Sequence, residues 1–247
     1  MAILVTRPRP DNEATAAALR ANGFDVLLAP MLRFEPLAFQ DDPDARYGAV
    51  IVTSANAVRA IDSGPAIGGL LPLPMFAVGE RTAEAARAAG FRNVTVASGD
   101  AAALRDLVVA GRAKTPKRAG TLLYLAGADL AGDLAGELGE RGFSVVTRTT
   151  YRMIPVHDLP RQVCEAFAAD RIEAVLHYSR RSARAFLDAV RAAGLEISAL
   201  ALPQCCISDA VAAILREVGA TQVTVARAPD ENGLFEALHR ALAALSR

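Results

Sequence analysis

Short apolar runs rich in β-branched residues alternate with alanine-rich segments along almost the whole chain. The apolar runs have the length and composition of strands that are buried on both faces, as in a parallel sheet. They span residues 3–7, 25–31, 49–54, 75–79, 94–98, 121–126, 144–151, 174–178, 204–208 and 222–227. Glycines that can cap the helices between them are Gly23, Gly90, Gly111, Gly142, Gly194 and Gly219. The pattern predicts an α/β fold built on parallel sheets.

Two segments are longer than an ordinary strand of roughly five or six residues. Residues 26–36 and 145–155 each follow a helix that ends in Gly-Phe, and each ends in a proline. Two matching, over-long strands indicate two places at which the chain crosses from one domain to another. We expect the crossings to form a hinge, with Tyr151 directed from it into a cleft.

The order of elements repeats once within the chain. Residues 4–24 match 123–143, residues 49–54 match 174–179, and residues 90–97 match 219–226. The sequence therefore predicts two copies of one α/β unit, at roughly 3–111 and 122–247. Two similar lobes form a cleft, and small ligands usually bind in clefts between domains.

The composition is that of a soluble globular protein, with 52% hydrophobic and 22% charged residues in a chain of 247. The formal net charge of zero provides no general attraction to nucleic acid or to an acidic membrane surface. Three cysteines cannot make a disulfide framework, and three scattered histidines do not make a zinc site. The N-terminus leads directly into an apolar strand, so we expect no signal peptide, and no apolar run is long enough to span a bilayer. We expect a cytoplasmic protein with no metal, nucleic-acid or membrane partner.

Ligands of parallel α/β sheets bind beyond the carboxyl ends of the strands, where the next helices begin. Such strand-to-helix turns lie at 6–8, 53–56, 78–82, 126–129, 178–182 and 208–209. Most contain a serine, threonine or aspartate, and capping the helix is the simpler role for any one of these side chains. As a set, several helix N-termini at one cleft offer N–H groups and partial positive charge to an anion.

Arg180 and Arg181 fall in the first turn of a predicted helix, and Arg184 follows one turn later. Cations at that position are unfavourable by something like 0.3–1 kcal/mol each, which favours an anion bound at this turn. Arg7 and Arg9 repeat the arrangement near the N-terminus. The alternative is that these arginines are solvated surface side chains.

Common catalytic signatures are missing. The sequence has no Gly-x-Gly-x-x-Gly after a strand, no Walker loop and no Gly-x-Ser-x-Gly elbow, and no cysteine has an obvious histidine partner. His177 lies within a predicted strand, where we expect a buried, hydrogen-bonded imidazole rather than a catalytic one. These features predict a cofactor-free, two-lobed protein that binds a polyanionic small molecule.

Several segments recur in one known family in this order and spacing. They are Leu4-Val5-Thr6-Arg7-Pro8, Gly23-Phe24, Ala29-Pro30-Met31, Phe34-Glu35-Pro36, residues 47–58, residues 76–83 and Thr149-Thr150-Tyr151. On these segments the chain resembles the uroporphyrinogen-III synthases over its whole length. The resemblance implies two flavodoxin-like α/β lobes joined by a two-stranded ladder. One lobe would take residues 1–35 and 155–247, the other residues 38–147, and strands 26–36 and 145–155 would form the ladder. The N-terminal βαβ unit of each repeat would then pack with the later part of the other repeat.

The reaction implied by the resemblance is the cyclisation of hydroxymethylbilane to uroporphyrinogen III in tetrapyrrole (heme, siroheme or chlorophyll) biosynthesis, with loss of water and inversion of ring D. Loss of the hydroxyl leaves an azafulvene cation that the pyrrole stabilises, so the enzyme needs mainly to hold the substrate in position. Tyr151 matches the family's cleft tyrosine, a donor to the departing hydroxyl. The resemblance further implies a monomer that could receive its substrate from hydroxymethylbilane synthase.

Other site residues come from the same resemblance and from the turns and arginines above. Thr82 and Ser179 match recurrent cleft hydroxyls, while residues 53–56 match a substrate-facing turn of the family. The predicted substrate-binding residues are Thr6, Arg7, Thr53, Ser54, Asn56, Gly79, Thr82, Gly127, Ser179, Arg180, Arg181 and Ser208.

The chain departs from the family at three turns. Residues 207–211 lack a Gly-x-Thr-Thr-like turn, residues 126–130 lack an arginine, and 229–232 replace a Pro-Thr pattern. Arg180 and Arg181 are candidates to replace the missing arginine. These departures leave open a non-catalytic two-lobed module that binds tetrapyrroles or anions. A sugar-nucleotide transferase with two Rossmann-like lobes is a more distant alternative, for which the sequence offers no nucleotide fingerprint.

Overall fold

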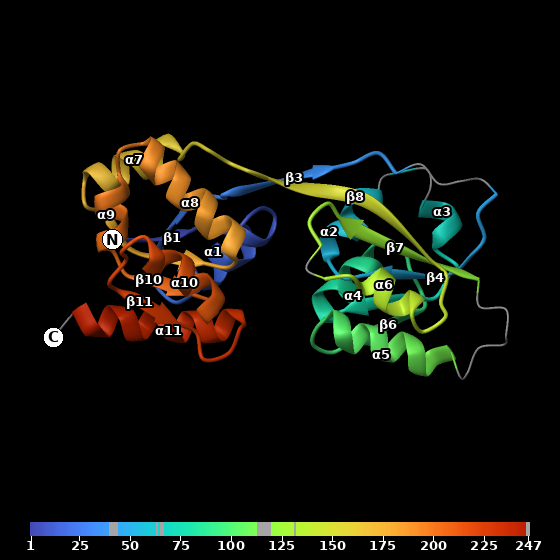
Figure 1. The fold of residues 1–247 in the computed structure, drawn as a ribbon. Helices are drawn as coiled ribbons and strands as arrows, with labels where there is room; N and C mark the ends of the chain where they lie inside the picture. Colours follow the sequence, from blue (N-terminus) through green and yellow to red (C-terminus); the bar gives the residue numbers. More distant parts are fainter. Residues whose placement is uncertain (40–43, 63, 65–66, 113–119, 131, 246–247) are drawn as a thin grey trace. The chain divides into compact units, whose positions relative to one another are not determined.

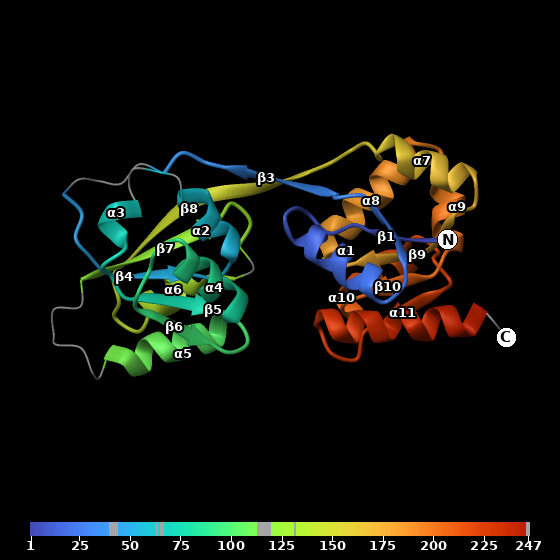
Figure 2. The same ribbon diagram turned by 180° about the vertical axis from the view of Figure 1, so that it is seen from behind.

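The computed structural model describes residues 1–39, 44–62, 64, 67–112, 120–130 and 132–245. The chain divides into two compact units, which can be followed from two sides in Figures 1 and 2. Unit 1 comprises Met1–Arg33 and Ile154–Arg247, and unit 2 comprises Phe34–Met153. Strands and helices alternate along the chain, and the strands form two largely parallel sheets, which confirms the predicted α/β class.

The first sheet has five parallel strands in the order β11-β10-β9-β1-β2. These strands are β1 (Ala2–Val5), β2 (Asp25–Leu28), β9 (Ile172–His177), β10 (Gln204–Cys206) and β11 (Val223–Val225). The helices of unit 1 are α1 (Asp11–Ala21), α7 (Arg161–Ala168), α8 (Arg180–Ala192), α9 (Glu196–Ala201), α10 (Asp209–Glu217) and α11 (Glu231–Leu245). The strand order reverses between β1 and β9, so a ligand is expected beyond the carboxyl ends of these two strands.

The second sheet has six strands in the order β3-β8-β7-β4-β5-β6. These strands are β3 (Leu32–Pro36), β4 (Tyr47–Val52), β5 (Met75–Val78), β6 (Val94–Ala97), β7 (Thr121–Gly127) and β8 (Val145–Pro155). The helices of unit 2 are α2 (Ala55–Ile61), α3 (Ile67–Leu70), α4 (Glu80–Ala88), α5 (Ala101–Arg112) and α6 (Leu134–Gly139). The strands from β8 to β6 are parallel, and the order reverses between β7 and β4.

Apolar side chains are buried on both faces of each sheet, which explains the continuous apolar runs in the sequence. In unit 2, Val50 and Val52 of β4 pack with α2 and α4. Ile51, between them, packs on the opposite face with α5 and α6. In unit 1, α1 and α11 share one buried cluster with the sheet, and α8 and α10 share another.

Both sheets combine strands from the two sequence repeats. The first sheet takes β1 and β2 from the first repeat and β9, β10 and β11 from the second. The second sheet takes β7 and β8 from the second repeat and β4, β5 and β6 from the first. Matching strands hold matching places, because β2-β1-β9-β10-β11 and β8-β7-β4-β5-β6 are the same order. The order is that of flavodoxin-like sheets.

Residues 26–36 do not form one over-long strand, which corrects the prediction. The segment divides into β2, which pairs with β1 in the first sheet, and β3, which pairs with β8 in the second. Pro30, between the two strands, has no N–H to contribute to a ladder. The neighbouring backbone is still anchored, since Ala29 N–H donates to the Val5 carbonyl at 2.9 Å and Met31 N–H to the Thr6 carbonyl at 3.2 Å.

Residues 145–155 do form one strand, as predicted, and β8 is 11 residues long. Two backbone hydrogen bonds mark its pairing with the chain around β3. Leu37 N–H donates to the Thr150 carbonyl at 2.7 Å, and Val156 N–H donates to the Met31 carbonyl at 3.0 Å. From the first bond to the second, the residue number falls from 37 to 31 in one segment and rises from 150 to 156 in the other, so the two segments run antiparallel. The division between the two units falls within both β3 and β8.

The glycine prediction holds at the helix ends but fails at Gly111. Positive φ angles occur at Gly23, Gly90, Gly142, Gly194 and Gly219, as expected for residues that end a helix in the left-handed region. Gly111 instead lies within α5, which continues to Arg112. A Cβ at this position would be 3.9 Å from the Phe76 ring, so the helix packs closely against β5 there.

His177 is completely buried at the end of β9, which confirms the structural role predicted for it. Its Nε2 lies 2.8 Å from Oε1 of Gln204. The Gln204 amide nitrogen donates to the carbonyls of Ala199 and Leu202, so Oε1 accepts and His177 Nε2 must carry the proton. Burial lowers the pKa of His177 to about 4, although the hydrogen bond with Gln204 opposes this shift. The folded protein therefore holds this imidazole neutral.

We expect the free energy of unfolding to fall as the pH drops from 6.5 to 4, because the unfolded chain then binds a proton at His177 that the folded chain excludes. The loss should approach about 3 kcal/mol. Urea unfolding across this pH range should show a shallower dependence in His177→Gln than in the wild type. His157→Gln, which removes an exposed imidazole, is the control. Equal pH dependence in His177→Gln and the wild type would contradict the assignment.

Candidate functional site

A register shift in β8 sets the direction of the Tyr151 side chain. Ala126 of β7 pairs with Thr149, but the next residue, Gly127, pairs with Tyr151. Thr150 is the extra residue of this bulge; it is buried, and its hydroxyl donates to the Ala126 carbonyl at 3.3 Å. Successive side chains of a strand point to opposite faces, so a one-residue bulge exchanges the two faces for everything that follows.

The consequence is visible in the packing of β8. Val146, before the bulge, packs on the α2 and α4 face of the sheet. Five residues later, alternation alone would turn Tyr151 to the opposite face, yet it packs on the same face as Val146. Its ring lies 5.7 Å from that of Phe34, measured between centroids. The bulge therefore aims the phenol toward the starts of α2 and α4.

The Tyr151 ring packs directly against the backbone of Gly127, in space that any larger residue would fill. A Cβ at Gly127 would lie 2.7 Å from Cζ and 2.9 Å from the hydroxyl oxygen of Tyr151. The N–H of Ala128 donates to the Tyr151 carbonyl at 2.8 Å, which holds the backbone of the two strands together at this point. Gly127 was predicted as a substrate contact, and the structure makes it a neighbour of the predicted catalytic side chain.

The turn from β4 to α2 holds three of the predicted residues. Ser54 caps α2 by accepting from the Asn56 N–H at 3.2 Å. The Thr53 hydroxyl is 3.1 Å from the hydroxyl of Tyr124. Burial raises the pKa of Tyr124, while the Thr53 hydrogen bond lowers it and the nearby Tyr151 raises it. The Asn56 amide nitrogen lies 3.6 Å from the sulfur of Met153, two residues after Tyr151, which brings this turn and β8 together.

The start of α4 has no side-chain cap. Gly79 occupies the N-cap position with φ +73°, a backbone conformation that favours glycine. Thr82, in the first turn, is almost completely buried. The Thr82 N–H donates to the Gly79 carbonyl at 3.2 Å, so the backbone of the turn closes the start of α4 without help from a capping side chain.

In unit 1, the structure corrects the prediction for Thr6. The side chain is fully buried, and its hydroxyl donates to the Leu176 carbonyl at 2.8 Å. Its own N–H donates to the same carbonyl at 3.3 Å. Thr6 therefore joins β1 to β9 and has no surface to offer a ligand.

Arg7 belongs to a polar cluster of five residues, here called the Arg7 cluster: Arg7, Asp11, Thr15, Tyr178 and Glu231. Nη1 of Arg7 donates to Thr15 and to Oε1 of Glu231, both at 3.1 Å, and Nη2 lies 4.0 Å from Asp11. The guanidinium lies over the Tyr178 ring, 4.6 Å from its centroid. Burial is the main cause of a raised pKa at Tyr178. The cluster joins β1, α1, β9 and α11 at one end of the first sheet.

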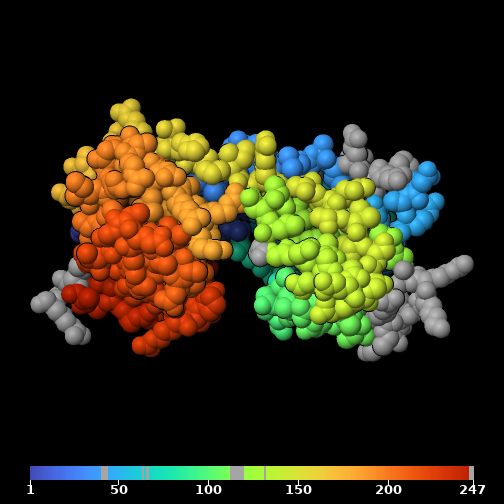
Figure 3. Space-filling view, in the orientation of Figure 1, coloured from blue at the N-terminus to red at the C-terminus, as the bar shows by residue number. Residues whose placement is uncertain are grey.

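The start of α8 combines a cap with two cations. Ser179 accepts from the Ser182 N–H at 3.1 Å, and the hydroxyls of the two serines are 2.8 Å apart. Arg180 is exposed and Arg181 is half-buried in the first turn, where no acidic residue accompanies them. Both α8 (orange) and α11 (red) reach the surface of unit 1 in the space-filling view (Figure 3).

Ser208 occupies the N-cap position of α10, but its side chain does not cap the helix. This position matches Gly79 in the sequence repeat, since β10-α10 and β5-α4 hold equivalent places in the two sheets. Two equivalent helices of the duplicated fold therefore begin without a side-chain cap. Asp100, Asp133 and Asp230 cap other helices in the usual way.

Sequence reasoning missed Tyr124, Thr15 and Glu231. Tyr124 is embedded in the apolar run of β7, where a tyrosine is an ordinary strand residue. Thr15 lies within a helix, and Glu231 is 224 residues away from Arg7. The departure from the family pattern at 229–232 was the single signal available for Glu231.

The described residues show no other chemical centre. Within them, no group of three or more histidine, cysteine, aspartate or glutamate side chains is arranged to hold a metal ion. All three cysteines are free, and burial raises the pKa of Cys205 and Cys206 to about 12, so these two thiols stay protonated. In the same described ranges, no helix has the length and hydropathy needed to cross a membrane.

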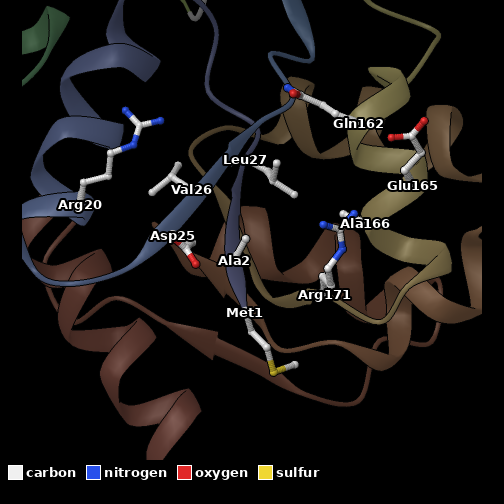
Figure 4. A pocket seen from close by; sticks show the side chains of 10 residues that line it. All are labelled: Met1, Ala2, Arg20, Asp25, Val26, Leu27, Gln162, Glu165, Ala166 and Arg171. Atoms are coloured by element: carbon white, nitrogen blue, oxygen red, sulfur yellow. The ribbon is translucent and has the colours of Figure 1, made fainter.

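A cavity of about 530 Å³ lies elsewhere in unit 1, near the amino ends of β1 and β2. Its lining comes from those strands, α1 and α7, and includes Arg20, Asp25, Glu165 and Arg171 (Figure 4). None of the predicted site residues lines it. It is therefore separate from the carboxyl ends of the strands, where the predicted residues lie.

Comparison with known proteins identifies relatives. A family model described as uroporphyrinogen-III synthase HemD matches residues 13–236. A solved structure of uroporphyrinogen-III synthetase from Helicobacter pylori is 18% identical, with a TM-score of 0.64, and the match covers 100% of this chain and 99% of that one. A structure of a mutant uroporphyrinogen III synthase from the extremely thermophilic bacterium Thermus thermophilus is 19% identical, with a TM-score of 0.57, and the match covers 99% and 100% of the two chains. At these identities the structures show a shared fold. A search of the curated proteins found no match.

We expect Gly127→Ala to lower the free energy of unfolding by about 1–3 kcal/mol, because the new methyl group overlaps the Tyr151 ring. The same substitution should cost much less in a Tyr151→Ala background, where the ring is gone. Urea unfolding of the wild type, both single variants and the double variant measures this coupling. Gly139→Ala, whose Cβ would meet nothing within 4 Å, is the matched control. Additive effects of the two substitutions would show that Gly127 does not support Tyr151.

Proposed function

The chain belongs to the uroporphyrinogen-III synthase family, whose members cyclise hydroxymethylbilane to uroporphyrinogen III in tetrapyrrole biosynthesis, and we propose that Tyr151 is the catalytic residue of this reaction. The observation that carries the proposal is the bulge at Thr150, which turns the phenol to the face of the sheet where α2 and α4 begin. The other predicted site residues, apart from the buried Thr6, bind and orient the substrate.

The reaction needs a proton at the hydroxyl of the substrate. The hydroxyl leaves as water and takes the electrons of the C–O bond with it. The substituted α-carbon of ring D then attacks the azafulvene cation, which gives a spiro intermediate. Cleavage of one of the bonds to the spiro carbon, followed by ring closure at the other α-carbon of ring D, inverts that ring. Loss of a proton restores the pyrrole, so that one molecule of water leaves overall.

Tyr151 is suited to the first of these steps. A neutral phenol can donate a hydrogen bond to the departing hydroxyl and can later accept a proton through the water that leaves. The ring is held by Gly127 and Phe34, so the hydroxyl is positioned before the substrate binds. Most of the remaining catalytic effect comes from holding the flexible chain of four pyrroles so that ring D can reach the cation.

The acetate and propionate arms of the substrate need anion-binding groups. The starts of α4 and α10, which carry no capping side chain, offer the partial positive charge of a helix N-terminus, and Arg180 and Arg181 offer full charges at the start of α8. Thr6 supports the first sheet from within. The other proposed substrate contacts are Arg7, Thr53, Ser54, Asn56, Gly79, Thr82, Gly127, Ser179 and Ser208.

Domain boundaries, assembly and location complete the proposal. The lobes are residues 1–35 with 155–247 and residues 38–147, with 26–36 and 145–155 as the connecting segments. The enzyme acts as a cytoplasmic monomer, for which its free cysteines suit a reducing compartment. Because free hydroxymethylbilane cyclises spontaneously to the type I isomer, direct transfer from hydroxymethylbilane synthase would limit that loss.

Incubation with freshly made hydroxymethylbilane should give the type III isomer as the main product. Chromatography of the oxidised porphyrins separates it from the type I isomer that forms without an enzyme. A heat-denatured sample of the same protein is the control. If the folded protein gave type I alone, at the rate of the control, the chain would be a binding module rather than a synthase.

Tyr151→Phe should lower kcat by about a hundredfold, the lower range for loss of a general acid, with little change in KM. Tyr47→Phe is the matched control because it removes the same hydroxyl at the amino end of β4, away from the site. It should retain wild-type kinetics. A Tyr151→Phe enzyme with a wild-type kcat would remove the phenol from the mechanism.

A further inference from the structure

The Arg7 cluster is built around a single carboxylate. Oε1 of Glu231 accepts from Arg7 Nη1 at 3.1 Å and from the Tyr178 hydroxyl at 3.4 Å, and it also contacts the Thr15 hydroxyl. Arg7 is held from a second side by the Tyr178 ring. Three donors, one in α1 and two in the turns that follow β1 and β9, therefore converge on one oxygen at the carboxyl ends of these strands, where the strand order of the first sheet reverses.

The charges in this cluster do not favour an added anion. The one positive charge of Arg7 faces Glu231 at 3.1 Å and Asp11 at 4.0 Å, so two carboxylates surround one guanidinium. This arrangement neutralises the cation that the sequence predicts as a substrate contact. An anion that approaches Arg7 in this state meets a net negative charge.

The two partners differ in how freely they can move. The Arg7 side chain is only 15% exposed and lies on an aromatic ring, whereas the Glu231 side chain is 37% exposed at the first position of α11. A rotation of Glu231 into solvent would leave Arg7 in place, stacked on Tyr178. The vacated position is then shaped by donors that already bind a carboxylate.

We propose that Glu231 is a built-in competitor that occupies Arg7 until a carboxylate arm of the substrate displaces it. The inference rests on the proposed function, because the acetate and propionate arms supply the competing carboxylates. Glu231 lowers the affinity for substrate and product alike, since both carry the same arms. Its return to Arg7 accompanies product release, which prevents a polycarboxylate product from being held too tightly.

Glu231→Gln tests this directly because it keeps the size and the accepting oxygen of the side chain and removes its charge. The probe is benzenehexacarboxylate, whose dissociation constant is measured by calorimetry. We expect the variant to bind the probe about three- to tenfold more tightly than the wild type. Glu13→Gln is the control, because it makes the same change in net charge at the start of α1, where Glu13 faces Arg9 at 3.9 Å. It should leave the dissociation constant unchanged.

A second variant shows whether the gain acts through Arg7. The tighter binding caused by Glu231→Gln should disappear in an Arg7→Gln background. If Arg7→Gln does not fold, a salt titration replaces it, and the gain of Glu231→Gln should shrink as ionic strength rises. The inference is overturned if Glu231→Gln binds the probe no more tightly than the wild type, or if no variant binds the probe. It is also overturned if Glu13→Gln shows an equal gain in affinity. A gain in Glu231→Gln that survives the loss of Arg7, or that does not respond to salt, would overturn it as well.

The test is independent of turnover. With hydroxymethylbilane, Glu231→Gln should lower KM by a similar factor. A wild-type protein that makes no type III isomer but shows the expected pattern with the probe would refute the synthase proposal and leave the competitor in place. The reverse result, a working synthase with no effect of Glu231→Gln on either measurement, would refute the competitor alone.

Discussion

A single extra residue in β8 determines the face of the second sheet on which Tyr151 lies. The bulge at Thr150 exchanges the two faces of the strand, so Tyr151 joins the face of α2 and α4 instead of that of α5 and α6. Thr150 is buried and bonded to β7, which makes the bulge part of the core. Gly127 leaves room for the ring, and the contact between Asn56 and Met153 joins the α2 turn to the same stretch of strand.

The duplicated fold places different side chains at equivalent positions of the two units. In each sheet the strand order reverses where a strand of one repeat meets a strand of the other, between β1 and β9 and between β7 and β4. The equivalent helices α4 and α10 both begin without a side-chain cap. Unit 2 adds the phenol of Tyr151. Unit 1 adds charge instead, through the Arg7 cluster and the arginines of α8. Under the proposed roles of Tyr151 and Glu231, unit 2 supplies the chemistry at the hydroxyl and unit 1 controls carboxylate binding.

Local patterns in the sequence predicted the local features of this structure. Apolar runs located the strands, the length of 145–155 held, and the buried His177 followed from its place in a strand. Caps at Ser54 and Ser179 followed from their positions before helices.

Features set by distant partners were missed. A proline divides 26–36 between two sheets, and Thr6 is buried by its bond to Leu176. The Arg7–Glu231 pair joins residues 224 positions apart, and the bulge at Thr150 is defined by the register of β8 with β7, which the sequence of one strand does not give.

If Tyr151, aimed by the bulge, serves the reaction, it meets the substrate on the α2 and α4 face of unit 2. A crystal structure with uroporphyrinogen III, kept reduced, tests this most directly. We expect a hydrogen bond between the Tyr151 phenol and the macrocycle, with a carboxylate arm at the N-terminus of α4. A macrocycle bound without contact to Tyr151, for example at the cavity lined by Arg20 and Arg171, would contradict it.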